Sequence, residues 1–183
     1  MYKRQGVESE TTPRMGMGHS AEFGCALGLF FNRSDQDIVE HSTNHMVDQF
    51  HGEWHDETDK VGSIAINLQN AIKEHFPDFG VPNLFQRYRR HSLSNLEHPI
   101  TTVTDFEWEH MIVDTKATLA VPSKPRDDHV RQQSLYSVLI GKPATLVYAS
   151  HKKSAVFELD EETVMRNYKT MINVSYTQLT QPT

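Results

Sequence analysis

The chain has 183 residues, of which 37% are hydrophobic, and its formal net charge at pH 7 is −6, so we expect one domain over residues 6–173. Its one cysteine, Cys25, excludes an internal disulfide framework, excludes an iron–sulfur cluster held by four cysteines of this chain, and favours a place in the core. No stretch approaches the ~20 apolar residues of a membrane span, so we expect no membrane contact.

Both ends of the chain read as foreign sequence. Residues 1–5 are the translation of the end of a common transposon sequencing adaptor, and residues 174–183 resemble the reverse-strand adaptor read as protein. We therefore expect a fragment from a metagenomic assembly, whose natural ends lie elsewhere.

The first half of the chain, about residues 18–80, is expected to be helical. Ser34 and Asp37 have the spacing of a capping box, and residues 59–72 carry recurring apolar positions. Pro77 and the glycine and proline that follow it are expected to end this helical part.

Histidines recur at helical spacing within this part, at His41, His45, His51 and His55. Each pair four residues apart shares a helical face, which is the spacing of a zinc pair. Their neighbours are mostly acidic or polar, so a solvated helix surface is the preferred interpretation. A His-rich metal-binding protein remains an alternative.

Two β-rich runs follow, at residues 100–106 and 111–118, joined by a stretch of hairpin length. Alternate residues of a strand share a face, so Asp114 and Lys116 point the same way, and the hairpin brings Asp105 towards them. Buried carboxylates are costly unless they are paired or bind a metal. Mg²⁺ or Mn²⁺ would remove much of that cost, and Lys116 would then orient or activate a water molecule.

A helix is expected over residues 129–140, where Gln132 and Tyr136 lie four apart on one face. Gly141 ends it, and residues 144–149 and 155–159 read as further strands. The expected order is strand, strand, helix, strand, strand.

The series Asp105, Asp114-x-Lys116, Gln132-x-x-x-Tyr136 resembles the PD-(D/E)XK nuclease superfamily, in particular its RecB-like exonuclease branch with stand-alone bacteriophage members. The resemblance implies an α/β, restriction-endonuclease-like fold with a central mixed sheet flanked by helices, and a catalytic core at about residues 98–160. It implies that Asp105 and Asp114 bind metal, that Lys116 is catalytic, and that Gln132 and Tyr136 hold DNA.

The same resemblance implies a further metal ligand from an early helix. We choose Glu22, because the small residues after it indicate close backbone packing, with His41 or His45 as rivals. The Thr115 carbonyl is a further candidate ligand.

One position departs from the family. Many relatives have a glycine two or three residues before the first Asp, where this chain has Thr102 and Val103. We expect this to alter a local backbone bend rather than the chemistry.

The net negative charge is unusual for a DNA-binding protein, although basic residues are grouped locally. Lys124 and Arg126 are expected to rim the cleft on the loop after the second strand. Residues 87–91 form another basic group, interpreted as either a phosphate contact or a solvated turn. We expect three aromatic side chains to pack in the core or cover the hairpin rather than stack on bases: Trp54, Phe85 and Trp108.

The function expected from the residues and the resemblance is a Mg²⁺- or Mn²⁺-dependent exodeoxyribonuclease in phage or bacterial DNA recombination or processing. It would act in the cytoplasm of a bacterial host on DNA, with a phage single-strand annealing or recombination protein as a candidate partner. Alternatives are a structure-selective or restriction-type endonuclease on the same core, and a non-catalytic DNA-binding subunit. Oligomeric state is left open.

Overall fold

The computed structural model describes residues 11–93 and 98–179. Of the expected foreign ends, residues 1–5 and the last part of 174–183, from 180 on, lie outside the described residues, and 174–179 belong to the last helix. The elements in chain order are α1 (Pro13–Phe31), α2 (Asp35–Gln49), α3 (Thr58–His75), the short 3-10 helix η1 (Pro77–Phe79), β1 (Leu84–His91), β2 (Ile100–Glu107), β3 (Ile112–Ala117), α4 (Asp127–Ile140), β4 (Ala144–Ala149), β5 (Ser154–Glu158) and α5 (Glu161–Leu179).

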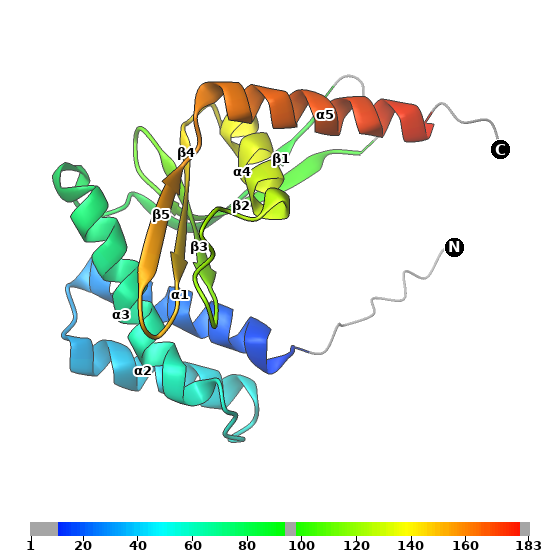
Figure 1. Cartoon of the computed structure of the whole chain (residues 1–183). Coiled ribbons are helices and arrows are strands. Elements are labelled where there is room, and N and C mark those ends of the chain that lie inside the picture. Colours follow the sequence, from blue (N-terminus) through cyan, green and yellow to red (C-terminus); the bar gives the residue numbers. More distant parts are fainter. Residues whose placement is uncertain (1–10, 94–97, 180–183) are drawn as a thin grey trace.

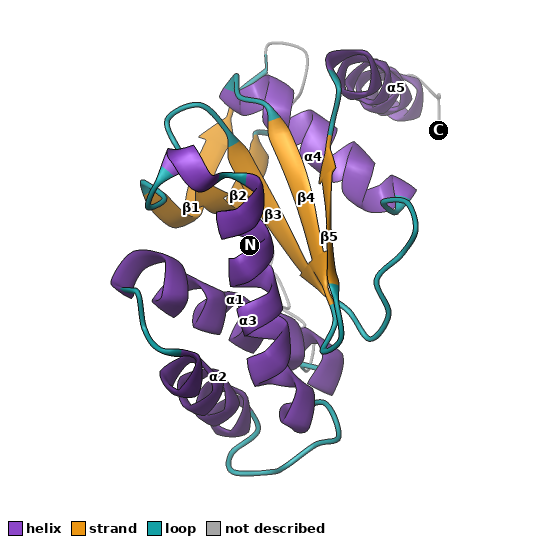
Figure 2. Cartoon of the chain, turned by 60° about the vertical axis from the view of Figure 1, so that its left-hand side comes forward, coloured by secondary structure: helices purple, strands orange, loops and turns teal. Residues whose placement is uncertain are grey.

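The five strands form one mixed sheet in the order β1-β2-β3-β4-β5. β3 and β4 are parallel, with α4 as the crossover between them, and the other neighbouring pairs are antiparallel. Helices α1 to α3 lie on one side of the sheet, and α4 and α5 lie on the other (Figures 1 and 2). The expected α/β class, a mixed sheet flanked by helices, is confirmed.

Adjacent residues of β3 supply the cores on the two sides of the sheet. Val113 belongs to the larger core with Phe106 and the buried faces of α1 and α3. Ile112 packs instead with Tyr136 of α4 and Ala144. This alternation fixes the register of β3, because a slip of one residue would exchange its two faces.

The helical layer packs closely around α1. A Cβ atom on Gly24 would lie 2.8 Å from the Ala65 Cβ and 2.9 Å from the Ser42 Cβ, and one on Gly28 would overlap the side chain of Gln69. The close backbone packing expected after Glu22 is therefore confirmed. It holds α1 firmly against α2 and α3.

Several local expectations are confirmed. The capping box at the start of α2 is present, with the Asp37 N–H donating to Ser34 Oγ at 3.2 Å. Cys25 and Trp108 are buried, and Phe85 packs against the main core. Trp54 is 60% exposed, so its expected core role is wrong.

Strand β1 was not expected, and the basic group at residues 87–91 lies in it rather than in a turn. Arg89 Nη1 in this strand lies 2.7 Å from Oε2 of Glu107, which is only 3% exposed. Lys142 Nζ donates to the same carboxylate at 2.7 Å and to the Trp108 carbonyl at 2.7 Å. Arg89 is thus a structural cation in the fold.

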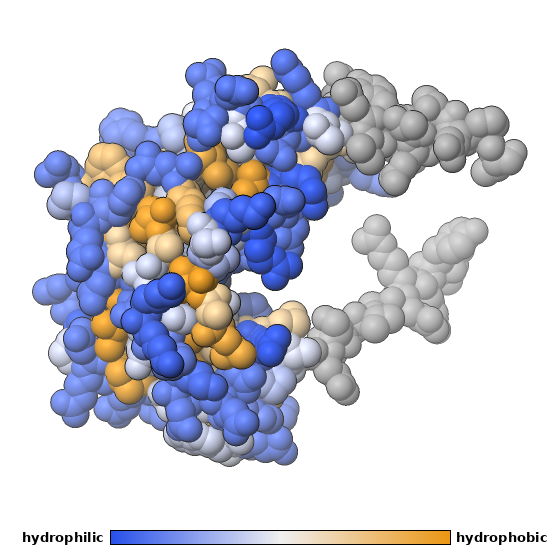
Figure 3. Space-filling view, viewed as in Figure 1, coloured by the Kyte–Doolittle hydropathy of each residue, from blue (hydrophilic) through white to orange (hydrophobic). Residues whose placement is uncertain are grey.

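Hydrophilic side chains cover most of the face seen in Figure 3. Within residues 11–93 and 98–179, no helix combines the length and the apolar character needed to cross a membrane.

Candidate active site

The site begins where β2 and β3 separate. These strands pair only at Phe106–Val113 and Glu107–Ile112. Beyond that point the Asp105 carboxylate replaces the missing strand neighbour, because its Oδ2 accepts the Thr115 N–H at 2.7 Å and the Thr115 hydroxyl at 3.0 Å. Asp105 is held in the opening between the two strands.

Asp114 and Lys116 lie on the same face of β3, as alternation requires. Lys116 Nζ is 2.6 Å from Asp114 Oδ2, and the Asp114 side chain is 4% exposed. Burial raises the pKa of Asp114, repulsion from Asp105 adds to it, and Lys116 opposes it, so the pKa reaches about 7. Burial also raises the pKa of Asp105, against Lys116 and the bonds from Thr115.

Lys116 itself remains a cation. Burial works to lower its pKa, but the carboxylates of Asp114 and Asp105 outweigh that effect, so the pKa of Lys116 is raised. One ammonium group therefore stands among several carboxyl groups, with Asp114 as its direct partner.

Glu22 reaches this cluster from α1. Burial, followed by repulsion from Asp105 and Asp114, raises the pKa of Glu22 to about 9, while Lys116 and a hydrogen bond from Gln86 lower it. In the metal-free protein at neutral pH, Glu22 therefore keeps its proton. Glu22, Asp105 and Asp114 form one electrostatic group although they come from three elements.

Gln86 has an unusual backbone beside this group. It lies in β1 between the residues that pair with Phe106 and Thr104, so it stands opposite Asp105, and its φ is +48°. Its Nε2 is 3.5 Å from Glu22 Oε2. By contrast, β2 pairs regularly through Thr102 and Val103, so the departure from the family pattern causes no break there.

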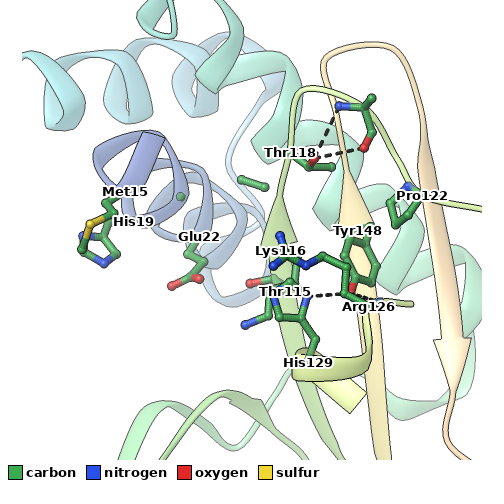
Figure 4. A pocket seen from close by; sticks show the side chains of 13 residues that line it. Met15, His19, Glu22, Thr115, Lys116, Thr118, Pro122, Arg126, His129 and Tyr148 are labelled. Atoms are coloured by element: carbon green, nitrogen blue, oxygen red, sulfur yellow. Dashed lines mark hydrogen bonds between the residues drawn. The ribbon is translucent and has the colours of Figure 1, made fainter. Parts of the chain in front are cut away.

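A cavity of about 600 Å³ is lined by two members of this group, Glu22 and Lys116. Figure 4 shows its two sides: His19 and Glu22 project from α1, and Arg126 and His129 lie beyond β3. Lys116 lies between them. The cavity therefore has Glu22 and His19 on one side, Arg126 and His129 on the other, and Lys116 between them.

The far side of the cavity is built by β4 and the start of α4. The Tyr148 hydroxyl accepts the Arg126 backbone N–H at 3.2 Å and is 2.6 Å from His129 Nδ1. The rings of His129 and Tyr148 also stack, with centroids 5.6 Å apart. Neither residue was predicted, although His129 precedes Gln132 by one helical turn.

His19 is also new to the site. It lies one helical turn before Glu22 on α1, lines the cavity, and its charge lowers the pKa of Asp105. The i, i+3 spacing from Glu22 was the available signal.

Only one of the four residues predicted to hold DNA lines the cavity. Arg126 lines the cavity, whereas Lys124 lies on the neighbouring surface hollow. Gln132 Nε2 donates to the Tyr136 hydroxyl at 3.4 Å, which agrees with their shared helical face. Tyr136 is 9% exposed and packs against Ile112, and neither it nor Gln132 lines the cavity.

The histidines of α2 that were alternatives to Glu22 as metal ligands lie away from the carboxylates. His45 Nδ1 is 2.9 Å from Ser20 Oγ, and its ring stacks on Phe23 with centroids 4.6 Å apart. His41 and His51 are exposed. Neither His41 nor His45 lines the cavity that contains Glu22 and Lys116.

The donor set fits a hard divalent cation in its chemistry, since Glu22, Asp105 and Asp114 offer oxygen atoms and a cation would relieve their mutual repulsion. As the side chains lie, no three His, Cys, Asp or Glu residues in the described part of the chain gather closely enough to enclose a metal ion. Instead, the Thr115 N–H and hydroxyl hold Asp105, and Lys116 holds Asp114.

Comparison with known proteins adds little. No model of a known protein family matches the chain, and no curated protein matches it. Among solved structures, "Crystal structure of SSO0001" is similar over 85% of this chain and 74% of that one, with 16% identity and a TM-score of 0.38.

Proposed function

We propose that the protein is a metal-dependent deoxyribonuclease that hydrolyses DNA phosphodiester bonds. The observation that carries the proposal is the electrostatic group of Glu22, Asp105 and Asp114 around one lysine, of which Glu22 and Lys116 line an open cavity. Pairs or groups of titratable residues with strongly shifted pKa values are typical of functional sites. A purely structural cluster would instead pair each carboxylate with a cation, as Glu107 is paired with two.

The acids are proposed to hold Mg²⁺ or Mn²⁺, which when bound polarises a phosphoryl oxygen and lowers the pKa of a water molecule. Asp105 is already oriented, because its Oδ2 accepts the Thr115 N–H and hydroxyl. Lys116 is proposed to orient the attacking water and to counter charge that builds on the phosphate.

Exonuclease action, a role in phage or bacterial DNA recombination or processing, and a place in the bacterial cytoplasm rest on the resemblance of the motif series alone. The same holds for a single-strand annealing or recombination protein as partner. The residues of the cavity support phosphodiester hydrolysis and do not distinguish an end from an internal site.

The test is cleavage of end-labelled linear DNA by purified protein with Mg²⁺ or Mn²⁺, and with EDTA. Lys116→Ala and Asp114→Asn should each lower the rate by about 10²-fold or more. The matched controls are Lys169→Ala and Asp59→Asn, which change exposed residues of α5 and α3 and should keep the wild-type rate.

Cleavage that is equal in the wild type and both site variants would overturn the proposed site. Supercoiled circular DNA separates the two enzyme classes, because an exonuclease needs a free end. Metal-independent DNA binding without cleavage would indicate the non-catalytic subunit instead.

A further inference from the structure

The far side of the cavity contains His129, whose ring contacts the hydroxyl of Tyr148. The Tyr148 hydroxyl accepts the Arg126 backbone N–H, so its single proton is free to go to His129 Nδ1, 2.6 Å away. Tyr148 is 1% exposed, which holds this hydroxyl in place. When the hydroxyl donates that proton, His129 Nδ1 is the acceptor and the imidazole carries its own proton on Nε2.

The surroundings favour this neutral form. Burial lowers the pKa of His129, the positive charges of Lys116 on β3 and Arg126 beside it lower it further, and Asp128 works the other way. Asp128 is occupied by the Arg126 guanidinium, at 2.8 and 3.1 Å, and stands 3.9 Å from His129 Nε2, beyond hydrogen-bond distance. Tyr148 completes the set of titratable groups that face the ring from β4.

The position of His129 matches the needs of an anion. It lines the same cavity as Lys116 and Arg126, opposite Glu22 (Figure 4). A phosphate held over the carboxylates would meet N–H donors on this side, and donors to a charged phosphate oxygen make the stronger class of hydrogen bond.

We propose that His129 is a substrate-contacting residue of this site: Tyr148 holds its Nδ1, and its Nε2–H donates to a phosphate of the bound DNA strand beside Arg126. The inference rests on the proposed function, since it names the side of the cavity that receives the phosphate. It assigns Tyr148 a positioning role through His129.

The test measures the affinity of fluorescein-labelled DNA by anisotropy with Ca²⁺, together with KM and kcat for cleavage with Mg²⁺. His129→Asn keeps an amide where Nδ1 stood and lacks Nε2, whereas His129→Gln places an amide N–H near Nε2. We expect about tenfold weaker binding for His129→Asn and recovery to within about threefold of wild type for His129→Gln. His110→Asn, an exposed change in the β2–β3 connection, is the control and should match wild type.

Tyr148→Phe tests whether Tyr148 acts through His129, because a purely structural role would leave the pH dependence of KM unchanged. It keeps the ring and removes the hydroxyl, so the proton of His129 is no longer fixed on Nε2. We expect KM to rise and its dependence on pH near the titration of His129 to change. The circular dichroism spectrum should match wild type, and loss of the bond to the Arg126 N–H should lower the unfolding temperature by a few degrees.

The outcomes separate the two proposals. Cleavage by the wild type with unchanged affinity and KM in His129→Asn overturns the role of His129 and leaves the nuclease standing. A wild type that neither binds nor cleaves DNA overturns both. Equal losses in His129→Asn and His129→Gln also overturn the Nε2 contact, because they indicate a packing defect.

Discussion

Replacing Asp114 by Asn should stabilise the metal-free protein above neutral pH. Burial, and then repulsion from Asp105, raises the pKa of Asp114 from 3.8 to about 7. The folded state thus binds this proton more tightly than the unfolded chain does. The contribution of Asp114 to stability is therefore fully present below pH 3.8 and is lost as the pH rises through the window up to about 7. An Asn at this position has no proton to lose.

The size of the effect follows from the width of that window. One pKa unit corresponds to about 1.4 kcal/mol. A rise from 3.8 to about 7 therefore sets an upper limit of ~4 kcal/mol for the cost of Asp114 above neutral pH. Local relaxation and water entry reduce such costs. We expect Asp114→Asn to gain ~1–3 kcal/mol in the free energy of unfolding at about pH 8, and little at about pH 4.

Urea unfolding followed by circular dichroism, in buffer with EDTA, measures this difference at both pH values. Asp59→Asn, which changes an exposed carboxylate in the first turn of α3, is the matched control. The reasoning is refuted if Asp114→Asn is less stable than wild type at about pH 8. It is also refuted if its gain at that pH does not exceed its gain at about pH 4.

Three further outcomes are expected. Adding Mg²⁺ at about pH 8 should raise the unfolding temperature of the wild type and not that of Asp114→Asn; no rise in the wild type would count against metal binding by these acids. Gln86→Gly should be more stable than Gln86→Ala by about 1 kcal/mol in urea, because Gln86 has a φ of +48°, and equal stabilities would argue against strain there. Gly24→Ala should lower the free energy of unfolding by ~1–3 kcal/mol, because its new Cβ would meet Ala65. Gly18→Ala, with nothing within 4 Å of its new Cβ, should raise it by up to about 1 kcal/mol. Changes of the same sign in both variants would contradict the close packing of α1.

The elements that the sequence predicts well are those whose burial follows a simple apolar period. The expected helix at 59–72 and the strands at 111–118 and 144–149 match α3, β3 and β4 within a few residues. Strand β1 was not predicted because most of its residues are polar and none is fully buried, and its half-buried Arg89 is held by an ion pair rather than by hydrophobic contact. Periodicity carries no information about such a contact.

The candidate site shows the same division. Asp114 and Lys116 could be placed together because strand alternation is a local rule. Tyr148 could not be recognised, since it sits in the wholly buried strand β4 and reads as core. Its contact with His129 depends on how the crossover from β3 through α4 to β4 folds back, and that geometry is not encoded in residue spacing.

The direction of a carboxylate's pKa shift distinguishes a structural role from a functional one. A carboxylate kept for stability, such as Glu107, has cations at hydrogen-bond distance, and burial is outweighed by Arg89 and Lys142 so that its pKa is lowered. Asp114 has its pKa raised despite Lys116, so the fold carries it at a cost. A residue held at such a cost is expected to gain stability and lose activity when neutralised. Asp114→Asn should therefore have a larger free energy of unfolding than the wild type and cleave DNA more slowly. Glu107→Gln should have a smaller free energy of unfolding. This contrast separates the two roles within one protein.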